Sequence, residues 1–466
     1  MNRLHRPPTA LSRGLEQITS AALGPHQTAV IRIGFSATWL FFLLRELPHR
    51  HELYGPQGPW SWELAHRLIL DNQAFTALMW TDSRVWFECV YGLAIVSSVL
   101  LMLGWRTRTM SVLFMVTALS LLNRSVFVGD GGDNVIHLMA MYLVLTRCGQ
   151  VWSLDARRAA RRARARADGT EEGRADGTAH EHVDATARAR ADGFPEPGQE
   201  RGSAAADPDR VGPVLWWILG LSLSLVTFLG HLGWGWALIL WTLWSAHGLW
   251  WLLGRWAPGS QPQALCDVVG NLLHNAALFV IMVEACLIYA TAGWYKVQGS
   301  RWQDGTAVYY PLHLDYFSPW PALSQLLSTH GTAIMLITYG TVIVQVAFPF
   351  TLFNRRVKNV LLAAMMIEHA VIAVLLGLPF FSLAMIAVDA VFLPTTFLRR
   401  IGKRAARARS ALSTRTRGVP GQWGSTGTAT GTGRDEAYGT GAPQTVPSDA
   451  EQPPGDPPQV DVSPRP

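Results

Sequence analysis

Charged residues are scarce in this chain of 466 residues. Asp, Glu, Lys and Arg make up only 15% of the sequence, while apolar residues make up 49%. Ordinary soluble domains carry roughly 25% charged residues. Most of the charges lie in two blocks, at 155–210 and after Leu398, and long stretches between them are nearly free of charge. Because lipid solvates such stretches and water does not, the composition excludes a set of soluble domains.

Paired cysteines and metal-binding spacings are also missing. The cysteines are Cys89, Cys148, Cys266 and Cys286, and they form no CxxC pair. We interpret them as small apolar residues of the interior rather than as a disulfide or zinc framework. The sequence contains no HExxH pattern, so no metal is expected. The first 26 residues are polar and no AxA-like site follows them, so no cleavable signal peptide is expected.

Aromatic residues are nearly absent from the linker at 155–210. Its one aromatic residue is Phe194. A segment that cannot bury a core is predicted to be disordered, although the Ala- and Arg-rich run at 156–167 favours a helix on a lipid surface. The tail at 401–466 is rich in Gly, Thr, Pro and Ser and is predicted to be disordered as well.

Long apolar segments dominate the rest of the chain and predict an all-α, polytopic bundle of transmembrane helices. A full crossing needs about 20 residues, and the segments near 110, 135 and 380 are shorter, so we expect eight to ten spans. The ten candidate spans are 29–44, 85–103, 110–122, 135–145, 213–229, 234–253, 272–292, 333–352, 360–376 and 380–392. Many of the 20 Trp residues lie near span ends, where an interfacial aromatic belt would place them.

Basic residues flank every second span end, which predicts the orientation. They precede the first span and follow the second, fourth, sixth, eighth and tenth. Cytoplasmic loops carry the excess of Lys and Arg, so both termini are expected in the cytoplasm of a multi-pass cell-membrane protein. The net charge of +6 is attributed to topology and to anionic heads of the lipid bilayer, not to nucleic acid.

This orientation divides the chain into five parts. A cytoplasmic segment at 1–26 precedes four spans within 27–154, and the linker separates these from six spans within 211–400. An outward loop covers 293–332, and the tail follows the last span.

The first informative outward region, at 123–137, joins the third and fourth spans. Its Gly-Asp-Gly-Gly-Asp sequence at 129–133 suits a tight turn, and Asp133 or Asn134 can cap the helix that follows. His137 lies one turn into that apolar helix, where an ionisable group is costly without a partner. Both a structural and a functional role are open for Asp133 and His137.

The second outward region, at 289–310, surrounds Lys296. This lysine lies just past the seventh span, between aromatic residues. One interpretation is an interfacial anchor whose stem lies along lipid while the amine reaches water. The other is a base, because an apolar and partly desolvated setting favours the neutral amine, which can accept a proton.

The pattern around Lys296 is Tyr-x-x-Ala-Gly-x-x-Lys, then Trp, then a Gly before a Tyr-rich helix start. The residues that carry it are Tyr289, Ala292, Gly293, Lys296, Trp302, Gly305 and Tyr309. This pattern resembles the vitamin K-dependent γ-carboxylase superfamily, whose bacterial members form the horizontally transferred transmembrane domain (HTTM) family. The 123–137 region, with Arg124, looks like a second recurring region of that family, as does Ser153-Leu154-Asp155. The resemblance covers roughly 25–400, and the fifth and sixth spans look like an insertion.

The resemblance implies an enzyme that uses a quinol with O2 and CO2. In the eukaryotic carboxylase, a lysine at the place of Lys296 is the proposed base that deprotonates vitamin K hydroquinone, and CO2 is added to a peptide Glu. The implied catalytic residues are Lys296 with His137 or Asp133. The implied binding residues for reduced vitamin K or menaquinol are Tyr289, Trp294, Trp302 and Tyr309. The substrate is then a peptide or protein on the outer side. The carboxylase has two adjacent lysines where this chain has Tyr295 and Lys296.

Further ionisable residues lie inside the predicted spans. They are Arg32, His274, Glu284, Glu368, His369 and Asp389. A charge at the bilayer centre costs roughly 2.5–3.5 kcal/mol on insertion scales, so these residues are expected to face the bundle interior and to pair. Glu284 lies about 18 Å before Lys296 along a continuous helix, within reach of a proton path.

Two other interpretations of the protein's function stay open. One is a transporter lined by these ionisable groups. The other is a non-enzymatic membrane partner or maturation factor for a peptide or a neighbouring protein.

Overall fold

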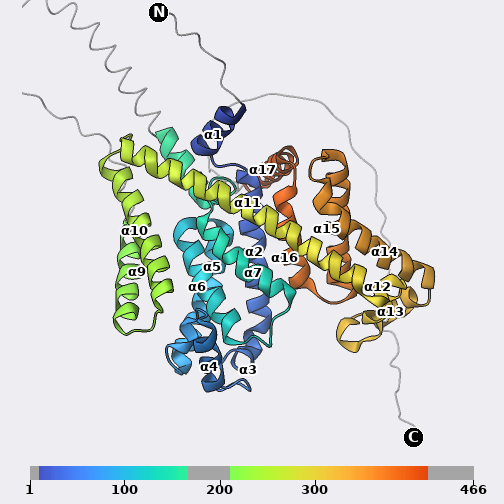
Figure 1. Cartoon of the computed structure of the whole chain (residues 1–466). Helices are drawn as coiled ribbons and strands as arrows, with labels where there is room; N and C mark the ends of the chain where they lie inside the picture. The colour runs from blue at the N-terminus through green and yellow to red at the C-terminus, as the bar shows by residue number, and fades with distance from the viewer. Residues whose placement is uncertain (1–9, 166–209, 418–466) are drawn as a thin grey trace, which may run out of the picture. The chain divides into compact units, whose positions relative to one another are not determined.

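The computed structural model describes residues 10–165 and 210–417, and all regular elements in these residues are helical (Figure 1). The longer helices are α1 (Ala10–Ser20), α2 (Pro25–Glu46), α4 (Trp62–Asn72), α5 (Arg84–Leu103), α6 (Thr107–Arg124), α7 (Gly131–Leu145), α9 (Val211–Phe228), α10 (Trp234–Trp256), α11 (Gln261–Gln298), α13 (Pro321–Ser328), α14 (Gly331–Ala347), α15 (Arg355–Leu375), α16 (Pro379–Asp389) and α17 (Thr395–Arg417). A further helix covers 154–165.

Short helical turns connect the longer helices. They are η1 (Leu47–His49), α3 (Arg50–Leu53), η2 (Ala77–Met79), α12 (Ser300–Gln303), η3 (Ala307–Tyr309), η4 (Pro311–His313), η5 (Asp315–Phe317), η6 (Phe348–Thr351) and η7 (Ala390–Phe392). The described part of 1–408 forms one compact unit. The residues after Ala408 form a second unit, of which only the end of α17 is described.

Seven of the described helices are long and apolar enough to cross a membrane. They are α2 with its extension to Leu53, α5, α9, α10, α11, α14 with η6, and α15. An eighth is added if α16 with η7 and the first part of α17, which are bent by 114° relative to each other, form one broken span. The chain is therefore an all-α, multi-pass membrane protein.

Two of the expected spans, α6 and α7, fall short of this test. α7 has 15 residues, which cover about 22 Å against a hydrocarbon thickness of about 30 Å. α6 has 18 residues, but Arg108 and Arg124 lie within them. Most of α6 is nevertheless buried in the bundle, so these helices form its interior. Ten helices of full length are not found among the described residues.

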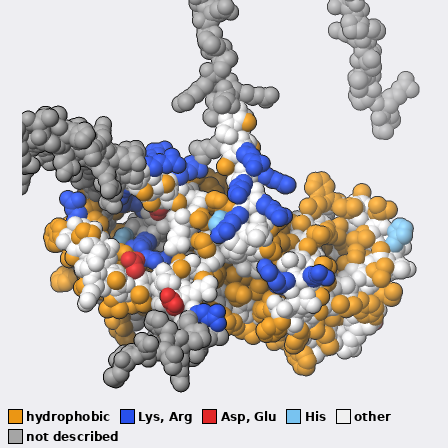
Figure 2. Space-filling model, turned by 90° about the horizontal axis from the view of Figure 1, so that it is seen from above, with side chains coloured by type: hydrophobic (Ala, Val, Ile, Leu, Met, Phe, Trp, Pro, Cys, Tyr) orange, Lys and Arg blue, Asp and Glu red, His pale blue; other side chains and the backbone are white. Residues whose placement is uncertain are grey.

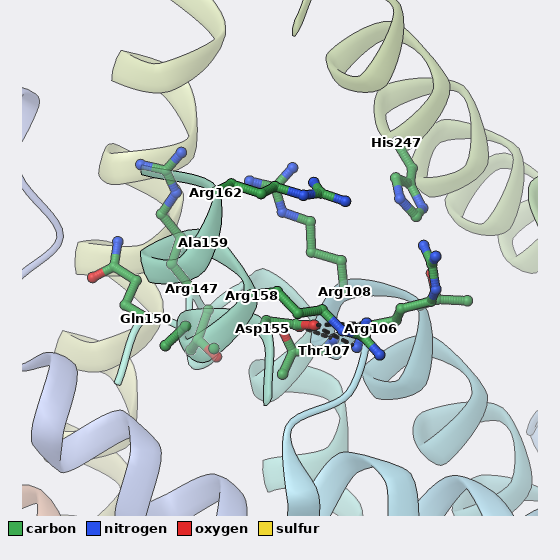
Figure 3. A pocket seen from close by; sticks show the side chains of 14 residues that line it. Arg106, Thr107, Arg108, Arg147, Gln150, Asp155, Arg158, Ala159, Arg162 and His247 are labelled. Atoms are coloured by element: carbon green, nitrogen blue, oxygen red, sulfur yellow. Dashed lines mark hydrogen bonds and ion pairs between the residues drawn. The ribbon is translucent and has the colours of Figure 1, made fainter. Parts of the chain in front are cut away.

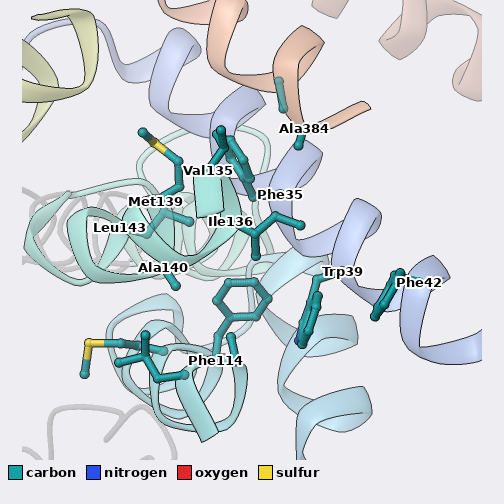
Figure 4. Packing of buried hydrophobic residues seen from close by; sticks show 14 of the residues in the cluster. Phe35, Trp39, Phe42, Phe114, Val135, Ile136, Met139, Ala140, Leu143 and Ala384 are labelled. Carbon is teal, nitrogen blue, oxygen red and sulfur yellow. The ribbon is translucent and has the colours of Figure 1, made fainter. Parts of the chain in front are cut away.

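The hydrophobic core lies where α2, α6, α7 and α16 meet. Phe35, Trp39 and Phe42 recur at helical spacing on one face of α2, and this face packs toward Phe114 of α6 and the apolar side of α7 (Figure 4). Trp39 is completely buried. Burial of such aromatic residues fixes α2 at the centre of the bundle.

Arg32 lies one turn before Phe35 on α2 and is completely buried. Its guanidinium donates to the carbonyl oxygens of Leu101 and Met102, at 2.5 and 2.8 Å, which end α5. It also donates to the carbonyls of Cys148 and Trp152, at 3.2 and 2.9 Å. The expected inward pairing is confirmed, but the partners are backbone groups. A cation satisfies the otherwise unpaired carbonyls at a helix C-terminus and favours the helix dipole there.

Two segments expected outside the fold are helical. α1 lies within the predicted cytoplasmic segment, and the side-chain amide of Asn275 on α11 donates to the Ile18 and Ala21 carbonyls near its end. α17 continues to Arg417, although disorder was predicted from 401. Ala and Arg are among the strongest helix formers, which explains this correction. The helix at 154–165 agrees with the helix favoured by the Ala- and Arg-rich run. The remaining predicted disorder, at 166–209 and 418–466, lies outside the described residues.

Basic side chains gather on one face of the molecule. Figure 2 views the side on which α1 and α17 lie in Figure 1, and Lys and Arg are prominent there beside large hydrophobic areas. Exposed basic residues of α17 include Arg399, Arg400, Lys403 and Arg404. One face thus carries basic residues that the sequence predicts to lie on the cytoplasmic side.

α9 and α10 form a hairpin at the side of the bundle (Figure 1). The rings of Trp216 and Trp244 stack at 4.0 Å, and each indole N–H donates to the backbone carbonyl of the other residue, at 3.1 and 3.0 Å. Most of the other side chains of the hairpin are exposed, as lipid-facing apolar residues would be.

Candidate functional site

Lys296 and Tyr289 lie on the same face of α11. They are two helical turns apart, a spacing that points both side chains the same way. α11 runs unbroken from Gln261 to Gln298, so the predicted span and Lys296 belong to one rigid helix. The face they share meets α14, α15 and α16, and each of these helices contributes a polar side chain.

Lys296 is joined to Glu368 through a glutamine. The Lys296 amine donates to Oε1 of Gln345 on α14 at 2.8 Å, and Nε2 of Gln345 donates to Oε1 of Glu368 on α15 at 2.8 Å. An amine with its proton donates and a carboxylate accepts, so this orientation of the amide satisfies both neighbours. Gln345 is buried, with 5% of its surface exposed, and therefore acts as a fixed link between the amine of Lys296 and the carboxyl group of Glu368.

A second cluster surrounds Tyr289. Its hydroxyl lies 2.9 and 3.0 Å from the two oxygens of Asp389 and 3.1 Å from Nε2 of His369. All three side chains are buried, and Asp389 is completely so. A hydroxyl has one proton. When it donates to Asp389, Nε2 of His369 must carry the hydrogen that meets the hydroxyl oxygen.

This assignment leaves Nδ1 of His369 as a buried acceptor with no hydrogen-bond partner. Such a group costs about 1–3 kcal/mol in a folded protein, so it stands out as a possible contact for a ligand. His369 adjoins Glu368 on α15, and the two clusters are therefore linked through one helix.

Gly293 sets the distance between α11 and α14. A Cβ atom at this position would lie 2.8 Å from Cγ2 and 3.3 Å from the backbone N of Val346. Val346 directly follows Gln345. Because only glycine lets the two helices approach this closely, Gly293 brings Gln345 within hydrogen-bond reach of Lys296.

The four predicted binding aromatics occupy different surroundings. The ring of Trp302 lies 5.1 Å from the Lys296 amine, a cation–π distance, and Tyr289 is buried in the cluster with Asp389. Trp294 is 63% exposed on α11. The ring of Tyr309 lies 4.0 Å from that of His313, tilted by 33°, and Tyr309 is 42% exposed. Trp302 and Tyr289 therefore belong to the polar site, while the side chains of Trp294 and Tyr309 are exposed.

Asp133 and His137 line a different cavity, of about 140 Å³, at the start of α7. Asp130 caps this helix by accepting from the backbone N–H groups of Gly132 and Asp133, and the Asp133 carboxylate accepts from the Asp130 N–H at 2.7 Å. The helix cap is thus Asp130, with Asp133 as its reciprocal partner in a capping box, rather than Asp133 or Asn134. Lys296 is not among the residues that line this cavity. The predicted catalytic residues consequently lie in two places.

Other ionisable residues of the predicted spans have varied surroundings. Nδ1 of His274 accepts from the Arg147 backbone N–H at 2.8 Å, and Nε2 lies 2.7 Å from the Leu23 carbonyl, so this residue joins two backbone segments. Glu284 is partly buried on α11 and is not part of either hydrogen-bonded cluster described above. Among the described residues, no three His, Cys, Asp or Glu side chains are grouped so as to hold a metal ion.

Sequence reasoning missed Gln345. Its one signal was a lone amide in the apolar run at 342–348. An uncharged amide stands out less in such a run than an ionisable side chain does. Glu368, His369 and Asp389 were recognised as costly groups within spans, but their meeting with Lys296 and Tyr289 was not predicted. The contacts join residues 49 and 100 positions apart, which local patterns do not encode.

Comparison with known proteins gives one curated relative. A stretch of 158 residues is 26% identical to the uncharacterized protein YitO of Bacillus subtilis (strain 168), covering 32% of this chain and 51% of that protein. The chain thus spans about half the length of the curated relative it matches. No family model and no solved structure matches the chain.

Proposed function

We propose that the chain is a membrane enzyme of the quinol- and O2-dependent carboxylase type, with Lys296 as its base. The observation that carries the proposal is the position of the Lys296 amine between the Trp302 ring and the Gln345–Glu368 link. The resemblance of 289–309 to the γ-carboxylase superfamily supplies the reaction class. The polar site is built on four packed helices, which hold its members in fixed positions.

The residues around Lys296 fit a reduced naphthoquinone. A quinol ring offers hydroxyl groups to an amine and a flat face to aromatic side chains, and Trp302 supplies such a face beside the Lys296 amine. The unpaired Nδ1 of His369 offers one further acceptor. When bound, reduced vitamin K or menaquinol would supply the electrons that reduce O2, while CO2 would be added to the acceptor without reduction.

Lys296 would take a proton from the bound hydroxyl. A neutral amine accepts the proton, and the resulting ammonium remains hydrogen-bonded to the Gln345 carbonyl. Glu368 compensates the new positive charge through the same amide without touching the amine directly. A direct carboxylate contact would hold the lysine permanently protonated, so the intervening amide suits a base that must cycle between two states.

The test is oxygen consumption by the purified protein given reduced menaquinone or vitamin K. We expect uptake with formation of a quinone epoxide, and its loss in Lys296→Ala while the protein remains inserted and helical. Lys358→Ala on α15 is the matched control and should retain uptake. Uptake that is unchanged in Lys296→Ala would remove Lys296 as the base, and no uptake by the folded wild-type protein would overturn the enzyme proposal.

The acceptor of CO2 in this proposal is a glutamate of a peptide or protein on the outer side of the cell membrane, the side on which the basic flanks of the spans predict Lys296. Incorporation of labelled bicarbonate into co-expressed membrane or secreted peptides measures this directly. Quinol-dependent uptake without incorporation would retain the quinol chemistry and exclude carboxylation.

A transporter is the second candidate, favoured by the burial of Asp389 and His369 within the bundle. Ionisable groups at membrane depth commonly mark proton pathways. Proton flux into liposomes that depends on Asp389, together with the absence of Lys296-dependent oxygen uptake, would favour this candidate over the enzyme.

A further inference from the structure

α17 leaves the bundle at a sharp angle. Its first part, Thr395–Ala408, is bent by 114° relative to α16 and η7, which precede it. Leu393 lies between them with an extended backbone, at a ψ of 138°, as a residue before a proline favours. A helix that turns this far after a membrane-spanning segment lies close to the plane of the membrane rather than across it.

Side chains from two other helices fix this bend. Nε2 of Gln27 on α2 donates to the Leu393 carbonyl at 2.8 Å and to Oγ1 of Thr395 at 2.9 Å. Nζ of Lys358 on α15 donates to the Phe392 carbonyl at 2.5 Å. These carbonyls lie where the helical hydrogen bonding is interrupted, so the side chains supply the donors that the break removes. The direction of α17 is therefore part of the packed structure.

One side of α17 packs on Trp152. Leu398 is 2% exposed, and a Cβ atom at Gly402 would lie 2.8 Å from Cζ2 and Nε1 of Trp152. Only glycine allows this approach. Trp152 is itself held in place, because its carbonyl accepts from the buried Arg32 guanidinium at 2.9 Å. The bundle thus provides a fixed seat for this side of the helix.

The 154–165 helix begins just after this seat and lies at the same end of the bundle. Its Asp155 accepts from the backbone N–H of Arg106, at the start of α6, at 2.8 Å (Figure 3). Arg158 of this helix and Arg147, which follows α7, line one cavity of about 580 Å³. We call this part of the molecule, formed by α17, the 154–165 helix and Arg147, the basic end.

A second side of α17 exposes two large apolar residues. Phe397 and Ile401 lie about one turn apart and are 48% and 43% exposed. They do not point into the seat, because Leu398 and Gly402 each follow them by one position and so point about 100° away. A pair of exposed apolar side chains beside a membrane-spanning segment suits the apolar boundary of a membrane.

Exposed basic residues occupy the rest of the circumference, and α17 contains no acidic residue. Arg400 and Arg404 lie within about 80° of the apolar pair around the helix axis, and Arg399 and Lys403 lie on the far side. A helix in a membrane interface has this arrangement. Its apolar residues enter the lipid, the nearest basic side chains reach the headgroups, and the others lie in water.

We propose that α17 lies in the interface of the membrane leaflet at the basic end and binds anionic phospholipids there. Phe397 and Ile401 then lie among the upper acyl chains. Arg400 and Arg404 lie beside the headgroups. The partner is lipid because α17 begins where the last apolar segment of a membrane protein ends, and charge complementarity selects anionic headgroups. Since Gln27 ties the bend to α2, this contact sets the depth of the bundle in the membrane, independently of the proposed enzymatic chemistry.

The first test measures the depth of α17 in the full chain, in nanodiscs of phosphatidylcholine and phosphatidylglycerol. In a protein whose four cysteines are replaced by serine, a nitroxide label at Ile401→Cys should collide severalfold more with O2 than with a water-soluble nickel chelate. The same label at Lys403→Cys, on the far side, should show the reverse preference. Free access of nickel to both labels would place α17 in water. Shielding of both labels from both reagents would mean that protein covers the helix, and either result would overturn the proposal.

The second test measures the contribution of charge, as phosphatidylglycerol retained by the protein in native mass spectrometry after release from the nanodiscs. Arg400→Gln/Arg404→Gln should retain about tenfold less, since two basic residues near an anionic surface together strengthen binding by roughly that factor or more. Arg399→Gln/Lys403→Gln removes the same charge from the far side of the same helix and should retain nearly as much as the wild type. Equal retention by all three proteins would overturn the binding of anionic lipid. Equal losses in both variants would overturn the arrangement of the helix in the interface.

Discussion

At the scale of single residues, the candidate site depends on an uncharged side chain. Gln345 is the link between Lys296 and Glu368, and both of its hydrogen bonds measure 2.8 Å. An apolar residue in its place would remove the hydrogen-bond partner that Lys296 and Glu368 share. Both polar side chains would then be partly buried without that hydrogen bond. Its function in the proposed enzyme is to position the base, since it touches Lys296 rather than the reacting atoms.

We expect Gln345→Leu to lower quinol-dependent oxygen uptake by about tenfold or more, because a lost hydrogen bond to a charged group is worth about 1.5–3 kcal/mol. The measurement is the uptake rate at saturating quinol as a function of pH. A change in the pH dependence would identify an effect on the base, whereas a purely structural role would lower the rate equally at every pH. Gln325→Leu, at an exposed position of α13, is the control and should leave both rate and profile unchanged.

Arg32 shows how one buried cation can have a structural role. It satisfies four carbonyl groups from two segments of the chain, the end of α5 and the segment after α7, and each carbonyl left unpaired in the interior costs about 1–3 kcal/mol. We therefore expect Arg32→Met to destabilise the protein by about 3 kcal/mol or more, measured by thermal unfolding in detergent. The same change at the exposed Arg13 of α1 should be nearly neutral. Equal unfolding temperatures for the two variants would contradict this account.

At the scale of elements, the close contact between α11 and α14 aligns the site. We expect Gly293→Ala to push these helices apart, since the new Cβ would lie 2.8 Å from Val346 Cγ2, and so to weaken the bond between Lys296 and Gln345. Unfolding temperature and oxygen uptake should both fall. Gly340→Ala on α14 is the matched control, because a Cβ there meets nothing within 4 Å, and alanine favours a helix by about 1 kcal/mol over glycine. If both variants behave alike, the close approach is not what aligns the site.

The elements also show what the sequence could predict. Apolar length identified the membrane helices, because lipid requires it of every spanning helix. It could not reveal that α1 is fixed by Asn271 and Asn275 of α11, at 2.9 and 2.8 Å from the Thr19 and Ile18 carbonyls. Such amide-to-backbone contacts join segments about 250 positions apart, and neither partner shows a periodic pattern. Lys296 was found because its charge stands out in an apolar setting, while Gln345 was missed because an amide does not.

At the scale of the whole molecule, α11 connects the candidate site with the basic end. Asp267 and Asn271, near its start, bond to Arg147 there, and Lys296 lies at its other end. Lys296 lies 29 positions after Asp267 on α11, which corresponds to about 43 Å of helix, more than the hydrocarbon thickness of about 30 Å. A helix of this length can place its two ends on opposite sides of a membrane when it is tilted by up to about 40°, the range found for membrane helices.

This length predicts that the basic end and Lys296 face opposite sides of the membrane. The basic end should face the cytoplasm, since an excess of Lys and Arg marks that side, and Lys296 should face outward. In a protein whose four cysteines are replaced by serine, Ser300→Cys beside Lys296 should react with an impermeant maleimide on intact cells. Ala160→Cys, exposed on the 154–165 helix, should react only after the membrane is opened. The reverse pattern would invert the orientation and place the proposed base in the cytoplasm. Labelling of both positions from one side would mean that α11 does not cross the membrane between them, which would remove the physical basis for placing the basic end and Lys296 on opposite sides.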